Sequence, residues 1–72
     1  MDKGIIERLE ILLKHWMEHN REHASEYGKW AKKAKKAGLE NVSVAIDEAT
    51  EGIEISNNNL LEALELLEKR SG

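Results

Sequence analysis

Apolar residues recur at alternating three- and four-residue steps through most of this 72-residue sequence. In the first half the repeat stays on one helix face for about eight turns. Its members are Ile6, Leu9, Leu13, Trp16, Asn20, His23 or Ala24, Tyr27, Ala31 and Ala34. This spacing matches the 3.6-residue period of an α-helix. It predicts one long helix over about residues 3–37.

The same alternation returns after a short interruption. Its members are Val42, Ile46, Ala49, Ile53, Ser56, Leu60, Ala63 and Leu67. We expect a second helix over about residues 42–69, with Asn41 as its N-cap. Between the two repeats, Gly38 suits the left-handed position that ends a helix, and Leu39 can fold back on Ala34.

The connection between the two helices, roughly residues 38–41, is short enough to require an antiparallel arrangement. The predicted fold class is therefore all-α, a helical hairpin forming a single domain over residues 1–72. The absence of proline supports helices, and Val, Ile and Thr form no alternating runs typical of strands. Residues 1–38 carry nine Lys or Arg against six Asp or Glu, whereas residues 39–72 carry two against eight. A basic helix beside an acidic one also favours antiparallel pairing, within a chain or between chains.

Further apolar residues widen both helix faces beyond what two helices in contact can cover. They are Ile5, Leu12, Trp30, Val44, Ile55, Leu64 and Leu66. The sequence therefore favours a homodimer that forms a four-helix bundle. The alternative is a three-helix bundle within one chain, broken near Asn20 or at "SNNN" (56–59), where helix propensity is poor.

Three histidines, His15, His19 and His23, follow one another at four-residue steps in "KHWMEHNREH". On the expected helix, His15 lies toward solvent, His19 lies at the rim of the apolar stripe, and His23 lies inside it. Asn20 lies near the middle of the stripe, and antiparallel pairing places it opposite residues 56–58. The two helices thus become polar at the same height, which predicts a polar layer at mid-length.

Histidines four residues apart on one helix can bind one metal ion together. We expect His19 and His23 as primary ligands, with His15 or Glu26 assisting and Asn20 orienting a ring or a bound water. Because the chain has no cysteine, the expected ion is one that imidazole binds well, nickel or zinc. In the alternative interpretation the polar layer only sets how the helices pair, and the histidines hold no ion.

Several function classes find no support in the sequence. It shows no Gly-rich phosphate loop and no nucleophile beside a base, so we expect a protein that is not an enzyme. The acidic second half would repel phosphate, which argues against nucleic acid as a partner. The apolar runs are too short to cross a bilayer, and "MDKGIIERLE" lacks the apolar centre of a signal peptide. We therefore expect a cytoplasmic protein with no membrane association.

The stretch "LLKHWMEHNREHASEYGKWAKKAKKAGLENV" resembles a small His-rich helical domain of anaerobic archaea and bacteria. That domain shows the pattern HW-x-EHN-x-x-HA, then WA-x-KA, then AG. The resemblance covers about residues 9–69 and is strongest at His15, Trp16, His19, Asn20 and His23.

This domain is associated with nickel-binding accessory proteins of carbon monoxide dehydrogenase maturation. The resemblance implies no assigned activity, and the nickel link belongs to a neighbouring β-structured domain outside these 72 residues. The expected function is nickel or zinc handling or sensing by a small dimeric protein. The alternative is a structural or protein-interaction module without metal.

Overall fold

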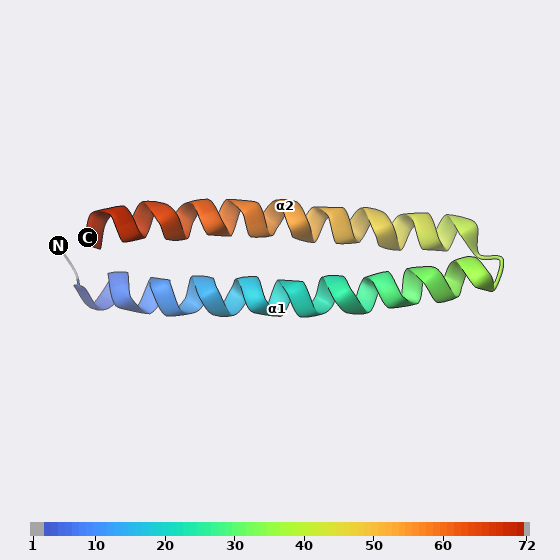
Figure 1. The fold of residues 1–72 in the computed structure, drawn as a ribbon, viewed down its shortest axis with the longest axis horizontal. Helices are drawn as coiled ribbons and strands as arrows, with labels where there is room; N and C mark the ends of the chain where they lie inside the picture. Colours follow the sequence, from blue (N-terminus) through green and yellow to red (C-terminus); the bar gives the residue numbers. More distant parts are fainter. Residues whose placement is uncertain (1–2, 72) are drawn as a thin grey trace.

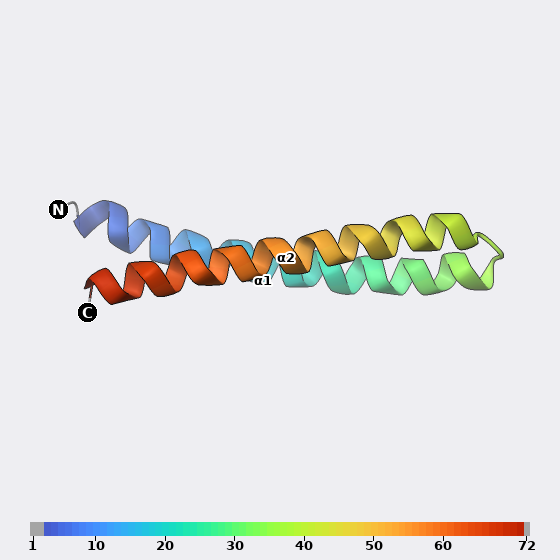
Figure 2. The same ribbon diagram turned by 90° about the horizontal axis from the view of Figure 1, so that it is seen from above.

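The computed structural model describes residues 3–71, which form a hairpin of two long helices (Figure 1). Helix α1 spans Lys3–Lys36 and helix α2 spans Glu40–Ser71. They run antiparallel, side by side along a molecule of 55 × 14 × 13 Å, and cross at a shallow angle (Figure 2). The predicted all-α hairpin is confirmed. The three-helix alternative is wrong for this chain, because both helices continue through the suspected breaks.

The predicted domain, 1–72, extends at both ends beyond the residues that the structure describes. Within residues 3–71, neither helix contains a stretch long and apolar enough to cross a membrane.

Helix α1 ends in a Schellman motif around Gly38, whose φ is 83°. The Gly38 N–H donates to the Lys35 carbonyl at 3.0 Å, and the Leu39 N–H donates to the Ala34 carbonyl at 2.9 Å. Glycine adopts this positive φ without the steric cost that a Cβ imposes. The predicted left-handed helix end at Gly38, with Leu39 folding back on Ala34, is confirmed.

Helix α2 begins earlier than the sequence indicates. The Ser43 N–H donates to the Leu39 carbonyl at 3.0 Å, so Leu39 occupies the N-cap position. Glu40 then places a carboxylate in the first turn, where the helix dipole favours negative charge. The prediction of Asn41 as the N-cap is therefore wrong, since Asn41 lies inside the helix.

The line along which α1 and α2 meet, here called the hairpin contact, buries few apolar side chains. Among the described residues, those buried are Leu13, Met17, Ala31 and Leu64. On α2 the buried and half-buried positions keep the three- and four-residue alternation of a helix packed on one neighbour. They include Ser43, Ile46, Thr50, Ile53, Asn57, Leu60, Leu64 and Leu67.

The hairpin contact does not coincide with the apolar stripe that the sequence predicts. On α2, the sequence predicts Val42, Ala49 and Ser56 inside, but all three are exposed, and the residue after each of them lies inside instead. On α1, Met17 is buried whereas Trp16 is 42% exposed. Successive helix residues are about 100° apart, so the centre of the stripe lies roughly 50° from the hairpin contact on both helices.

Side-chain hydrogen bonds set the register of the hairpin. The Asn20 Nδ2 donates to the Asn57 Oδ1 at 2.8 Å, and the Asn57 Nδ2 donates to the Met17 carbonyl at 3.1 Å. Nearer the turn, the buried Ser43 hydroxyl donates to the Ala31 carbonyl at 2.8 Å. The predicted meeting of Asn20 with residues 56–58 is confirmed, and Asn57 is the residue that makes it.

Replacing Asn57 by alanine should destabilise the hairpin. The change removes both bonds of the Asn57 amide and leaves the half-buried Asn20 amide without this acceptor. We expect the free energy of unfolding to fall by about 1–3 kcal/mol, measured by urea denaturation. The matched control is Asn58→Ala, an exposed neighbour, for which we expect a change within about 0.5 kcal/mol. Equal losses for the two variants would show that the Asn20–Asn57 bond does not hold the register.

Candidate interaction face and histidine pair

One side of the hairpin carries almost no charge. On α2, the two rows of residues that flank the hairpin contact on this side follow one another at three- and four-residue steps, and none of their members before Arg70 is ionisable. They are Val42, Ala45, Ala49, Gly52, Ser56, Asn59, Ala63 and Leu66. Most of them are small, which lets another helix approach closely.

The matching rows on α1 are apolar or aromatic, apart from two histidines at mid-length and two charged residues nearer the turn. They are Ile5, Leu9, Leu12, Trp16, His19, His23, Glu26, Trp30 and Lys33. The rows of the two helices lie on the same side of the hairpin, where both helices contribute residues to each of two shallow grooves. Trp16 and His19 line one of these grooves together with Ser56 and Asn59 of α2. We call this side of the hairpin, with its rows from both helices, the uncharged face.

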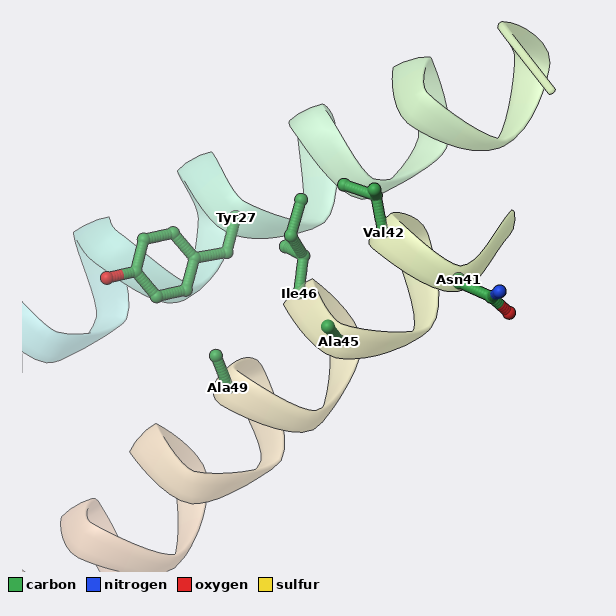
Figure 3. A pocket seen from close by; sticks show the side chains of 6 residues that line it. All are labelled: Tyr27, Asn41, Val42, Ala45, Ile46 and Ala49. Carbon is green, nitrogen blue, oxygen red and sulfur yellow. The ribbon is translucent and has the colours of Figure 1, made fainter. Parts of the chain in front are cut away.

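The second groove of the uncharged face lies nearer the turn. Figure 3 shows Val42 and Ile46 reaching from α2 toward α1, with Ala45 and Ala49 beside them and Tyr27 contributed by α1. Nearly all of this lining is hydrocarbon. Asn41, which also lines the groove, is directed away from the other five side chains in this view.

The opposite side of the hairpin is charged along both helices. Its ionisable residues are Glu7, Lys14, Glu18, Arg21, Lys32 and Lys35 on α1, and Glu40, Asp47, Glu51, Glu54, Glu65 and Glu68 on α2. Exposed apolar residues on this side, such as Ile11, Val44 and Leu61, stand singly among these charges. Scattered apolar residues of that kind are ordinary on protein surfaces, whereas a continuous uncharged face indicates an interaction site.

Trp30 engages both charged residues of the uncharged face. Its indole Nε1 donates to the Glu26 carboxylate at 3.0 Å, and the Lys33 ammonium lies 4.3 Å from the centre of its ring. The cation over the ring face is a favourable cation–π arrangement. The two charges are thus gathered around one aromatic side chain.

The three histidines are all exposed in the hairpin. The His19 and His23 rings lie closest, with centroids 4.4 Å apart and planes nearly perpendicular, whereas His15 stacks parallel to His19 at 6.3 Å. The prediction that His23 reaches the core is wrong for the hairpin, because the hairpin contact lies to one side of the stripe and Ala24 takes the half-buried position.

The predicted metal ligands are only partly brought together. Among residues 3–71 no three His, Asp or Glu side chains are grouped so that they could hold one ion. A single chain therefore offers the adjacent His19 and His23, while His15 and Glu26 as further ligands stay predictions. Asn20, expected to orient a ring or a water, bonds to Asn57.

A family model described as "Domain of unknown function (DUF8180)" matches residues 9–67. The chain belongs to this family. The match covers the histidines, the turn and most of both helices, so the hairpin is the structure of the DUF8180 domain in this chain. No curated protein and no solved structure matches the chain. The family description names no activity, and the association with nickel proteins stays a prediction.

The sequence-based reasoning missed two features of this site. The first is Asn57 as the specific partner of Asn20, although Ser43, Thr50 and Asn57 repeat every seven residues and thereby mark the hairpin contact. The second is the absence of charge from two neighbouring rows of α2 over residues 42–66. Both signals are present in the spacing of polar and charged residues rather than of apolar ones.

Proposed function

We propose that this DUF8180 domain works as a homodimer, in which two hairpins pack their uncharged faces together as a four-helix bundle, and that it serves as a protein-interaction module. The observation that carries the proposal is the displacement of the apolar stripe from the hairpin contact. On both helices, the part of the stripe that the hairpin leaves exposed lies on the same side.

The direction of this displacement suits a four-helix bundle. A helix in such a bundle has two neighbours about a right angle apart, so its core-facing stripe is centred between them. The stripe of each helix lies roughly 50° from the hairpin contact, close to half of that right angle. In the bundle, Trp16 and His23 of α1 and Val42 and Ala49 of α2 become part of a shared core.

The exposed area of the hairpin also supports a second copy. The chain exposes 5779 Å². A compact monomer of 8.2 kDa exposes only about 4,500 Å². The excess, about 1,200 Å², exceeds the roughly 800 Å² that each partner contributes to a standard protein–protein interface.

A charge placed on the uncharged face should weaken the dimer. Val42 and Val44 are similarly exposed, at 49% and 54%, but Val42 lies on the uncharged face and Val44 on the charged side. We expect Val42→Glu to shift the mass measured by sedimentation equilibrium from a dimer toward the 8.2 kDa monomer. The cause is the desolvation of two introduced carboxylates in the interface.

The matched control is Val44→Glu, which should remain a dimer at the same concentration. Loss of the dimer in both variants, or in neither, would contradict the assignment of the interface to the uncharged face.

A second candidate function is binding of a divalent transition-metal ion by His19 and His23, and the observation that favours it is the 4.4 Å between their ring centroids. These residues lie near the middle of α1, which spans Lys3–Lys36. Two hairpins related by a two-fold axis can lie with their turns at the same end or at opposite ends. In both cases the mid-length residues of the two copies lie at about the same height. The second copy can then supply the further imidazoles that a four-coordinate ion needs.

If this pair binds an ion, adding zinc or nickel should raise the melting temperature. Binding to the folded state alone stabilises it by RT ln(1 + [L]/Kd). We expect His19→Ala to abolish the shift and His15→Ala to leave most of it, measured by thermal unfolding with and without the ion. Acidification should also remove the shift, since only neutral imidazole coordinates a metal. An unchanged melting temperature of the unaltered protein with both ions would exclude this site.

A further inference from the structure

We infer that the two hairpins of the dimer lie with their turns at the same end, so that α1 of each copy packs against α2 of the other. This inference rests on the proposed dimer through the uncharged face. The alternative two-fold arrangement puts the turns at opposite ends. It places α1 beside α1 of the second copy and α2 beside α2 of the second copy.

The net charges of the two helices distinguish these arrangements. Helix α1 carries nine Lys or Arg and five Glu, and helix α2 carries eight Asp or Glu and two Lys or Arg. With the turns at the same end, each basic helix lies between two acidic ones. With the turns at opposite ends, two acidic helices lie along each other for their full length, and so do two basic helices. The first arrangement is favourable and the second repulsive.

One position at the rim of the uncharged face shows the same preference, whereas Arg8, in the same row of α1, would be level with Lys69 of the second copy. When the turns lie at the same end, each residue of α1 meets the second copy's α2 at the height it already has within the hairpin. That height is set by the Asn20–Asn57 bond. Lys29, nine residues after Asn20, is then level with Glu48 of the second copy, nine residues before Asn57. These side chains have opposite charges.

The opposite-end arrangement instead packs each helix against the same helix of the second copy. The Asn20–Asn57 bond places residue 20 of α1 level with residue 57 of α2, so a single two-fold axis crosses the two helices at matching heights. Individual exposed charge contacts are weak, so the preference rests on the net charges of the whole helices.

The absence of cysteine from the sequence makes the arrangement directly measurable. A nitroxide spin label on Lys36→Cys marks the exposed end of α1 next to the turn. Dipolar electron paramagnetic resonance then gives the distance between the two labels of a dimer. With the turns at the same end we expect this distance to be below about 30 Å, since neighbouring helix axes lie 8–10 Å apart.

With the turns at opposite ends, the two labels would be about 50 Å apart, because each lies about 16 residues from the middle of α1 at 1.5 Å per residue. A distance near 50 Å would overturn the inferred arrangement while leaving the dimer intact. The control is Glu18→Cys near mid-length, where the width of the bundle sets the label distance in both arrangements. No dipolar coupling at either position, together with a mass of 8.2 kDa, would overturn the dimer itself.

Discussion

A helix with one neighbour buries only the side chains that face it, and the contact between α1 and α2 meets each helix at the edge of its apolar stripe. On α2 this edge is largely polar, because it contains Ser43, Thr50 and Asn57. The other edge, with Val42 and Ala49, stays exposed. This displacement explains why the core is narrow and why aromatic side chains are exposed to solvent. The charged residues lie mainly on the opposite side of the hairpin, so the exposed part of both stripes faces the side with almost no charge.

The polar residues of the hairpin contact explain why the apolar stripe is displaced from this contact over most of the length of both helices. Asn57 bonds to Asn20 and to the Met17 carbonyl, and fourteen residues earlier Ser43 bonds to the Ala31 carbonyl, fourteen residues after Met17. Each bond adds little net stability, but a shift of the pairing would leave these groups without their partners. The hydrogen bonds therefore hold the hairpin in one register and one rotation. That rotation turns the exposed part of both stripes to the same side.

Sequence periodicity was sufficient for the two helices, the turn at Gly38 and the height at which Asn20 meets the second helix. It was insufficient for the rotation of each helix about its own axis. The apolar stripe of a helix faces all of its packing partners, so its centre does not show where a single partner lies. Ser56 and Asn57 differ by about 100° around the helix, and the two hydrogen bonds of Asn57 to α1 favour Asn57 over Ser56 at the hairpin contact. The exposure of His23 has the same origin, since the stripe that contains His23 is wider than the hairpin contact.

The central claim is that a second copy of the chain covers the uncharged face and contributes to its stability. Thermal unfolding measured over a hundredfold range of protein concentration tests this claim most directly. If folding and dimerisation are coupled, the melting temperature should rise by about 3–6 °C for each tenfold increase in concentration. A melting temperature that does not change over this range, with a mass of 8.2 kDa throughout, would contradict the account.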